Sequence, residues 1–249
     1  MADLLVIVPT RGRPDNLRRV IEAWRATGAF ADAALLAVID ADDPQREAYE
    51  RIEWDAKLAD PELIQVGGGL ILATEPEWLP MVHKLNRWAA TAASSPWQPF
   101  ALAFAGDDHL PRTHGWARRY LDELHDLGTG IVYGDDLLQG ANLPTQWAMT
   151  SDIVRTLGRM VPADVQHLYC DNAIAVLGQA AGCLRYLPDV VVEHVHPLAG
   201  KAEMDDGYRR VNSSQRYRDD RAAFLRWVAE GFDADTARIK ALREVAVHG

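Results

Sequence analysis

The chain has 249 residues, of which 48% are apolar and 25% are charged, and its formal net charge is −10. These values are those of an ordinary soluble globular protein, long enough for one large α/β domain or two small ones with a sizeable core. The acidic balance argues against a general electrostatic grip on nucleic acid, which needs a basic face, but it leaves room for a local basic pocket that holds a phosphorylated small molecule.

Short apolar runs alternate with amphipathic helical patterns from the N-terminus to about residue 134. The run LLVIVPT, residues 4–10, predicts a strand buried on both faces. Residues 14–27 predict a helix, because Pro14 suits a first turn and apolar residues follow at helical spacing. This alternation predicts a parallel, doubly wound sheet with helices on both faces. The same signals predict further strands at 34–40, 63–74 (broken by a glycine turn), 100–106 and 130–136, and helices at 43–58, 79–93 and 114–128.

The pattern changes after residue 140. Residues 143–158 predict a strand or loop that runs into a short helix, and residues 169–182 predict a helix. Residues 183–197 predict two short strands around Pro188. Two amphipathic helices, near Gln215–Glu230 and Asp235–Val247, are expected to end the chain. No repeat or evident linker interrupts it, so a single domain is expected over residues 1–249, with divisions at 134 and 210.

The N-terminus and the cysteines are used to predict where in the cell the protein lies. MADLLVIVPTRGRP lacks a basic leader, a long apolar core and a cleavage site, so it does not predict a signal peptide. No stretch approaches the roughly 20 apolar residues of a membrane helix. Cys170 and Cys183 are the only cysteines, which predicts neither a disulfide framework nor a zinc ribbon. A cytoplasmic protein is expected.

Polar residues follow three of the predicted strands: Thr10-Arg11, Asp40 and Asp107-Asp108. Ligands of such sheets bind outside the carboxyl ends of the strands, so these residues are candidates for a binding site. The alternative is that loops are simply polar. This explains any one of the three loops more readily than it explains all three together. The chain has no Gly-x-Gly-x-x-Gly after its first strand and no Gly-Lys-Ser/Thr phosphate loop, which weakens the dinucleotide and P-loop hypotheses. Gly67–Gly69 is interpreted as a turn.

The stretch FAGDDHLP, Phe104–Pro111, takes an apolar strand into a glycine, two carboxylates and a histidine. Magnesium and manganese prefer oxygen ligands and often bind through one or two carboxylates plus substrate phosphates. Asp107 and Asp108 therefore suit a cation beside a nucleoside diphosphate. The alternative is helix capping by Asp108 or Thr113. Spacing alone leaves both open.

The stretch VVVEHVHP adds two imidazoles to this hypothesis. His194 and His196 would point to the same face of a strand, so both could face one pocket. Histidine is a common metal ligand, although a His-x-His pair is more often a surface or core pair. Lys201 and an acidic run follow shortly after, which is consistent with a polar loop that closes on a ligand.

The segments LLVIVPTRGRPDNLRRVIEAW, AVIDADDP and FALAFAGDDHLPRTHGW resemble the GT-A-fold glycosyltransferases, close to the large family two of nucleotide-sugar transferases. The resemblance covers roughly residues 4–210, with LYCDN and EHVHPLAGKA similar to later parts of the pattern. It implies a GT-A fold, a Rossmann-like, mostly parallel sheet, with residues 1–134 binding the nucleotide, 135–210 completing the acceptor and metal sites, and C-terminal helices over 211–249. The nucleotide-sugar contacts that it implies are Pro9, Thr10, Arg11, Arg13, Asp40, Lys84, Asp107 and Lys201.

The resemblance also implies a bound Mn²⁺ or Mg²⁺. The family's acidic motif is usually Asp-x-Asp, but here Gly106 occupies one of those places. That departure leaves open which carboxylate binds ribose and which binds metal; Asp108 is favoured for the metal. The late histidine segment is similar to the metal-ligand histidine of several GT-A enzymes, and His194 and His196 remain equal candidates.

An inverting transferase needs a base that deprotonates the acceptor hydroxyl. Asp171 matches the position of the family's catalytic aspartate, and the alternative is an ordinary first-turn aspartate favoured by the helix dipole. Trp78, Trp147 and Tyr208 are candidates for stacking on sugar or base, and QWAMT, residues 146–150, for an acceptor floor.

These observations predict a metal-dependent glycosyltransferase that moves a sugar from a nucleoside diphosphate donor, with UDP favoured, to an acceptor hydroxyl, with inversion. The acceptor is a glycan, a small molecule or, less favoured, a modified nucleic acid. One alternative is a sugar nucleotidyltransferase, which usually has a lysine-bearing glycine loop that PTRGRP lacks. Another is a nucleotide-sugar-binding module that has lost catalysis, for which Gly106 is the main support.

Overall fold

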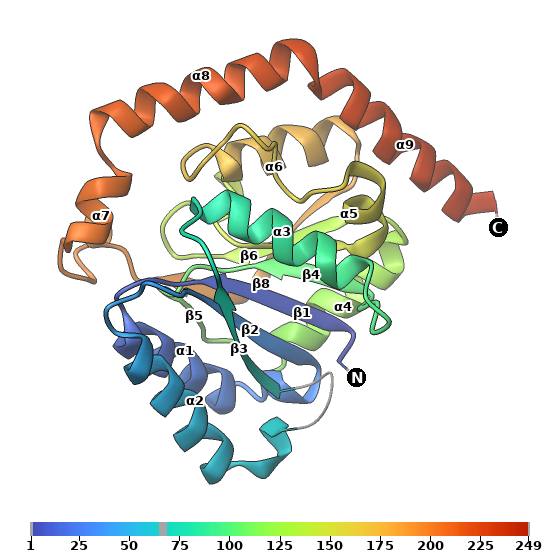
Figure 1. Ribbon diagram of the computed structural model, residues 1–249. Helices are drawn as coiled ribbons and strands as arrows, with labels where there is room; N and C mark the ends of the chain where they lie inside the picture. The colour runs from blue at the N-terminus through green and yellow to red at the C-terminus, as the bar shows by residue number, and fades with distance from the viewer. Residues whose placement is uncertain (1, 65–68, 249) are drawn as a thin grey trace.

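The computed structural model describes residues 2–64 and 69–248. Within these residues one eight-stranded sheet runs through the molecule, with helices on both of its faces (Figure 1). Its strand order is β3-β2-β1-β4-β7-β6-β8-β5. The strands are β1 (Leu4–Pro9), β2 (Ala33–Asp40), β3 (Gly69–Glu75), β4 (Ala101–Phe104), β5 (His109–Pro111), β6 (Ile131–Asp135), β7 (Trp147–Thr150) and β8 (Leu184–His194).

The sheet is mostly parallel, as the sequence predicts. β1 pairs in parallel with β2 and β4, and β2 pairs in parallel with β3. β7 is antiparallel to both β4 and β6, so β6 points the same way as β4, and β8 runs parallel to β6. The short β5 closes the order antiparallel to β8. The two reversed strands therefore lie in the second half of the sheet, where the simple alternation of the sequence ends.

Helices cover the two faces because alternate residues of the buried strands point to opposite sides. Leu4, Val6 and Val8 of β1 pack with α1, α2 and α4. Leu5 and Ile7 pack with α3, α5 and α6. α8 and α9 cover these helices on the side away from the sheet and contribute Ala223, Trp227 and Ile239 to the same core (Figure 1). The helices are α1 (Pro14–Ala26), α2 (Arg46–Ala59), α3 (Met81–Ala93), α4 (Trp116–Leu127), α5 (Ser151–Leu157), α6 (Cys170–Ala180), α7 (Asp206–Val211), α8 (Ser214–Glu230) and α9 (Phe232–His248), with 3₁₀ turns η1 (Ala29–Ala31), η2 (Pro61–Ile64), η3 (Gly140–Asn142) and η4 (Pro197–Ala199).

The helix signals of the sequence are largely confirmed. Pro14 lies in the first turn of α1, and α4 ends at Gly128, whose positive φ of 68° suits the residue after a helix. The two C-terminal helices are present, whereas α7 was not predicted. The strand predicted to begin at residue 63 is wrong at its start, because Pro61–Ile64 forms a 3₁₀ turn. Residues 65–68, which include two of the three glycines interpreted as a turn, lie outside the described residues.

The prediction of two short strands around Pro188 is wrong, because a single strand, β8, runs from Leu184 to His194. Its pairing with β6 shifts between Gly134, which faces Leu187, and Asp135, which faces Val191. The chain bulges around Pro188, which has no N–H to donate to a neighbouring strand. A Cβ at Gly134 would lie 2.4 Å from the carbonyl oxygen of Val190, so a glycine permits this close approach.

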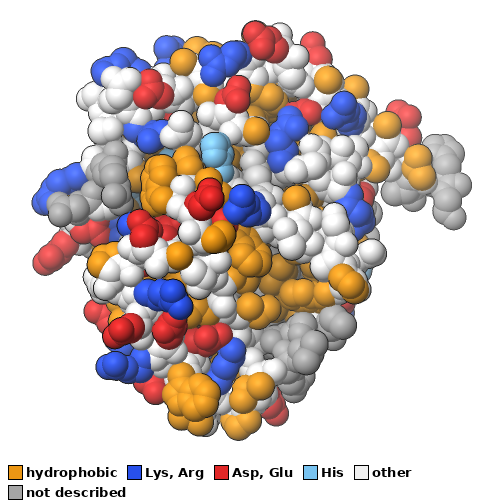
Figure 2. Space-filling view, in the orientation of Figure 1, with side chains coloured by type: hydrophobic (Ala, Val, Ile, Leu, Met, Phe, Trp, Pro, Cys, Tyr) orange, Lys and Arg blue, Asp and Glu red, His pale blue; other side chains and the backbone are white. Residues whose placement is uncertain are grey.

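The face of the molecule shown in Figure 2 carries charged side chains of both signs. Among the coloured side chains of Figure 2, Lys and Arg are interspersed with Asp and Glu rather than gathered in one patch. No helix in the described part of the chain has both the length and the apolar character needed to cross a membrane.

Candidate functional site

A cavity of about 660 Å³ opens at the carboxyl ends of β1 and β4, where ligands of such sheets bind. Its walls come from elements far apart in the sequence: the turn after β1, the start of α3, the turn after β4, the loop and first turn of α6, the end of β8, and α7 with the start of α8. Its polar lining includes Thr10, Arg11, Arg13, Lys84, Asp107, Asp108, His109, Thr145, Gln166, His167, Asp171, Asn172, His194, His196, Tyr208, Asn212 and Arg216.

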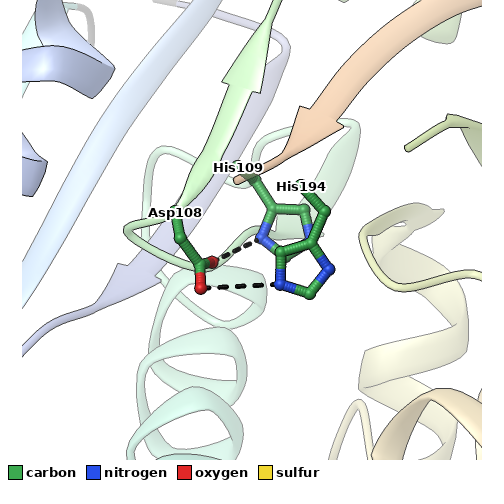
Figure 3. A group of neighbouring side chains, drawn as sticks. All are labelled: Asp108, His109 and His194. Carbon is green, nitrogen blue, oxygen red and sulfur yellow. Dashed lines mark ion pairs between the residues drawn. The ribbon is translucent and has the colours of Figure 1, made fainter. Parts of the chain in front are cut away.

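Asp108, His109 and His194 meet at one wall of this cavity (Figure 3). Each offers a ligand atom, and these atoms lie within 4.8 Å of one another. Oδ1 of Asp108 is 3.1 Å from Nδ1 of His109, and Oδ2 is 3.5 Å from Nε2 of His194. The two imidazoles stack with their centres 4.1 Å apart. The group follows from the sheet, because β5 and β8 pair with His109 directly opposite His194.

The three ligand atoms fit a divalent cation. A carboxylate oxygen suits magnesium and manganese, and imidazole nitrogen suits the transition metals. A set of one carboxylate and two imidazoles therefore favours Mn²⁺ over Mg²⁺. The described residues thus contain a set of side chains that can hold the expected cation.

His109 is the residue of this group that sequence reasoning did not assign to the metal. The residue is 5% exposed, and its Nδ1 accepts a hydrogen bond of 3.0 Å from the backbone N–H of Gly106. Its position next to Asp108 was visible in the sequence. The pairing of β5 with β8, which turns it toward His194, has no local sequence signal.

His196 lies beside this group but outside it. Its ring packs edge-on against His194, with centres 4.8 Å apart, and against Tyr208, with centres 5.0 Å apart. β8 ends at His194, so the same-face argument for a strand does not extend to His196. The hydroxyl of Tyr208 donates a 2.5 Å hydrogen bond to Oδ2 of Asp108. Of the two histidines, His194 is the one that the structure brings to Asp108.

The adjacent carboxylates Asp107 and Asp108 have opposite electrostatic surroundings. Burial, together with the charge of Asp108, raises the pKa of Asp107 to about 6. Burial also acts to raise the pKa of Asp108, but the imidazoles of His109 and His194 outweigh it and lower that pKa well below its ordinary value. Asp108 is therefore the more firmly ionised carboxylate of the pair, as a metal ligand should be.

Asp107 is held by the turn after β1 and the first helix. Its Oδ2 accepts a 2.6 Å hydrogen bond from the hydroxyl of Thr10. Its Oδ1 lies 3.4 Å from Arg13 and 3.3 Å from the side-chain amide of Asn16. Arg13 also pairs with Asp205 at 2.7 Å. Asp107 thus joins three segments but stays outside the metal-ligand group.

Arg11 and Lys84 line the cavity, and Asp40 lies beneath them. The Asp40 side chain is 0% exposed; one oxygen is 2.6 Å from Nζ of Lys84 and the other is 2.9 Å from Arg11. Arg11 also pairs with the exposed Asp42 at 2.6 Å. Asp40 is therefore positioned to orient two cations toward the cavity. Pro9 lines the cavity, whereas Lys201 does not: it pairs with Glu193 at 2.7 Å, on a more exposed surface.

Asp171 lies in the first turn of α6 and lines the same cavity. One of its oxygens accepts a 2.8 Å hydrogen bond from the backbone N–H of Asn172. Among the described residues, no cation pairs with it. Burial raises its pKa above the ordinary 3.8, and hydrogen bonds from backbone N–H groups only partly oppose this. It is thus a carboxylate whose affinity for protons is increased.

The structure gives the positions of Trp78, Trp147 and residues 146–150, which were predicted to contact a ligand. Trp78 lines the cavity and is 52% exposed. The acceptor floor at residues 146–150 is wrong, because β7 is a buried strand between β4 and β6. Trp147 in it is 0% exposed and packs against Phe104, so it stacks on no ligand.

The helix-capping alternative for Asp108 and Thr113 is also wrong. The residue that precedes α4 is Gly115, and no side chain caps that helix end. The hydroxyl of Thr113 instead bonds the chain of β8, accepting from the N–H of Val191 at 2.8 Å. Asp108 is thus free of a capping role.

Comparisons with solved structures show the same architecture. The mannosyltransferase PcManGT from Pyrobaculum calidifontis, in complex with GDP-Man and Mn²⁺, matches with a TM-score of 0.61 at 15% identity, over 98% of this chain and 80% of that one. The GT-A fold is shown. S. aureus TarS matches with a TM-score of 0.55 at 10% identity, over 100% of this chain and 92% of that one. Glucosyl-3-phosphoglycerate synthase from Mycobacterium tuberculosis, with Mn²⁺, UDP and glucosyl-3-phosphoglycerate, matches with a TM-score of 0.56 at 11% identity, over 89% and 78%.

The sequence comparisons add nothing to this: no protein-family model and no curated protein matches the chain. At identities of 15% or less, the likeness to the three structures concerns the GT-A architecture alone.

Proposed function

We propose that the protein is a Mn²⁺-dependent glycosyltransferase that moves a sugar from a nucleoside diphosphate donor to an acceptor hydroxyl, with inversion at the anomeric carbon. The observation that carries the proposal is that the group Asp108, His109 and His194 lines the same cavity as Asp171. A candidate cation site and a candidate base thus line the same cavity. A cation at this site would neutralise a leaving diphosphate. The GT-A fold supports this assignment.

The donor is proposed to lie along the basic wall of the cavity. Arg11, Arg13 and Lys84 present positive charge beside the carboxyl ends of β1 and β4, where a diphosphate needs it. Asp108, His109 and His194 would hold the cation, which stabilises the negative charge of the departing diphosphate. The compared structures include complexes with UDP and with GDP-Man, and we propose a UDP-sugar as the first donor to test.

Asp171 is proposed to take the proton of the acceptor hydroxyl as that oxygen attacks the anomeric carbon. A general base works best when its pKa lies closer to the working pH, and burial shifts the pKa of Asp171 in that direction. Asp107 and Asp108 are less suited, because hydrogen bonds and neighbouring charges engage both of them. The acceptor proton therefore goes to Asp171 and the negative charge to the diphosphate.

The departure at Gly106 does not favour a module that has lost catalysis. A Cβ at this position would lie 2.5 Å from Oδ1 of Asp108 and 2.8 Å from Nδ1 of His109. A side chain at Gly106 would thus displace the metal ligands themselves. The glycine is interpreted as a requirement of the three-ligand group rather than as a missing ligand.

Release of nucleoside diphosphate tests the function. The purified protein is incubated with UDP-sugars and GDP-sugars in Mn²⁺ or EDTA, and free UDP or GDP is measured. We expect Mn²⁺-dependent release from at least one donor, lost in Asp108→Asn. Asp171→Asn should keep UDP affinity within about twofold and lower transfer by about 10²–10⁴-fold.

The same assay separates the alternative activity. A sugar nucleotidyltransferase would consume a nucleoside triphosphate with a sugar phosphate and release pyrophosphate. Pyrophosphate release without hydrolysis or transfer of a nucleotide-sugar would overturn the proposal, and so would UDP binding that is tight, indifferent to Mn²⁺ and unaccompanied by turnover.

A further inference from the structure

The sequence contains Gly-Asp-Asp twice, and the carboxylates of the second copy, Gly134-Asp135-Asp136 at the end of β6, are not among the residues assigned to the candidate site. The two copies approach His194 from opposite sides. Asp108 of the first copy lies 3.5 Å from Nε2 of His194, and Asp136 of the second lies 4.0 Å from Nδ1. The imidazole of His194 therefore stands between two carboxylates.

Asp136 is a rigidly held anion. It is 1% exposed, and its Oδ1 accepts three hydrogen bonds from the backbone N–H groups of Leu138, Gln139 and Gly140, at 3.0, 2.6 and 2.9 Å. Its Oδ2 accepts a 2.7 Å hydrogen bond from the hydroxyl of Thr145. These bonds fix the carboxylate in one orientation and leave acceptor capacity on Oδ2, the oxygen nearest His194.

The same residue holds His194 through the backbone. The N–H of His194 donates a 2.9 Å hydrogen bond to the carbonyl oxygen of Asp136. Nδ1 of His194 is buried and has no hydrogen-bond partner among the described residues. The nearest oxygen recorded for it is Oδ2 of Asp136. Nε2 faces the carboxylate of Asp108 at 3.5 Å, so a cation shared by these two groups would leave the proton of His194 on Nδ1, beside the fixed negative charge of Asp136.

We propose that Asp136 is a positioning residue that keeps the proton of His194 on Nδ1 and so leaves the lone pair of Nε2 available to a divalent cation held with Asp108 and His109. Histidines that bind metals usually donate their other N–H to a carboxylate, carbonyl or water, which fixes the tautomer and the ring orientation. Here the β6–η3 loop supplies that carboxylate. This role rests on the proposed metal site.

Asp136→Asn is an informative variant because it changes the charge and keeps the shape. The three backbone N–H donors require an oxygen at the Oδ1 position, so the new amide N–H₂ faces Thr145 and His194. An N–H donor beside Nδ1 favours the proton on Nε2, which then cannot bind a cation. We expect the Mn²⁺ dissociation constant to rise 10–100-fold. The matched control is Asp135→Asn, which removes the same charge at the neighbouring residue. It should leave the Mn²⁺ dissociation constant within about twofold of the wild-type value.

Calorimetric titration with Mn²⁺ alone, without nucleotide, tests the proposal in the wild type, in both variants and in each variant combined with His194→Ala. The role is supported if Asp136→Asn weakens Mn²⁺ binding in the wild-type background but causes no further loss of affinity in the His194→Ala background. The effect of Asp136 then depends on the imidazole of His194. Equal affinities of Asp136→Asn and the wild type overturn it, and so does an equal loss in both backgrounds. A wild type that binds no Mn²⁺ overturns the metal site of the proposed function and this role with it.

A second measurement needs no variant of Asp136. Long-range ¹H–¹⁵N correlations of His194 in the wild type, with Zn²⁺ as a diamagnetic probe cation, report which ring nitrogen carries the proton. Protonated Nδ1 with unprotonated Nε2 supports the proposal. A proton on Nε2 in the metal-loaded protein overturns it.

Discussion

Among single residues, the proposed base Asp171 gives a test of stability as well as of activity. Burial raises its pKa, and hydrogen bonds from backbone N–H groups, including that of Asn172, only partly oppose the rise. A carboxylate with a raised pKa is a better proton acceptor, but its ionised form is costly in the folded protein. The candidate base is therefore expected to reduce stability at neutral pH.

The pH dependence of stability follows from that raised pKa. The folded protein binds the Asp171 proton more tightly than the unfolded chain, so this group contributes stability below its ordinary pKa of 3.8, and the contribution is lost as pH rises through the folded pKa. We expect Asp171→Asn to raise the urea midpoint at pH 7 and to leave it unchanged near pH 3.5. Urea unfolding at both pH values measures this. A lower midpoint at pH 7 would contradict the assignment.

Gly106 gives a second test at the residue scale. Because a Cβ there would meet Asp108 and His109 at 2.5 and 2.8 Å, Gly106→Ala should displace the ligand atoms. We expect Mn²⁺ affinity to fall about tenfold or more, as calorimetry would show. Unchanged affinity would mean that the ligand group tolerates a side chain at position 106 and that the glycine is not required for metal binding.

At the scale of elements, the loop before α6 is held by an anion from α8. The buried carboxylate of Asp220 accepts hydrogen bonds from the backbone N–H groups of Gln166, His167 and Leu168, at 3.0, 3.1 and 2.8 Å. These residues line the cavity just before Asp171. α8 therefore holds in place a loop that lines the cavity.

Asp220→Ala should leave these backbone N–H groups without their acceptor. Buried donors without partners cost stability, so we expect a loss of about 3 kcal/mol in the free energy of unfolding. Urea unfolding measures it, and Asp219→Ala on the exposed side of α8 is the matched control, expected within about 0.5 kcal/mol of the wild type. Equal effects of both substitutions would contradict this role of Asp220.

The elements also show which parts of the fold were predictable. β1, β2 and β4 are continuous apolar runs ended by turn residues, so their local sequence was sufficient. The placement of β7 between β4 and β6, and the pairing of β5 with β8, depend on contacts between distant segments. The position of His109 depends on the second of these. For this reason the sequence indicated Asp108 with His194 or His196 as equal candidates, but did not assign His109 to the metal.

At the scale of the whole molecule, the site joins the two halves of the chain. Arg13 from the N-terminal half pairs with Asp107 and Asp205, and Tyr208 bonds Asp108 across 100 residues of sequence. A ligand that binds this junction should stabilise the folded state as a whole, because it binds only when both halves are in place.

Mn²⁺ with UDP should therefore raise the melting temperature. At free ligand near 100 times the dissociation constant, binding contributes about 2.7 kcal/mol. For a chain of this length that corresponds to roughly 5–10 °C. Differential scanning fluorimetry measures the shift, EDTA should reverse it, and His194→Ala should remove most of it. An equal shift in His194→Ala would place the ligand elsewhere.

We propose that a cation held by Asp108, His109 and His194 binds a nucleoside diphosphate beside Asp171. Anomalous diffraction from crystals grown with Mn²⁺ and UDP tests it most directly. We expect one strong anomalous peak enclosed by the Asp108 carboxylate and the two imidazoles, with the diphosphate oxygens of UDP at bonding distance from it. A manganese peak remote from these side chains, or a diphosphate bound away from the peak, would contradict it.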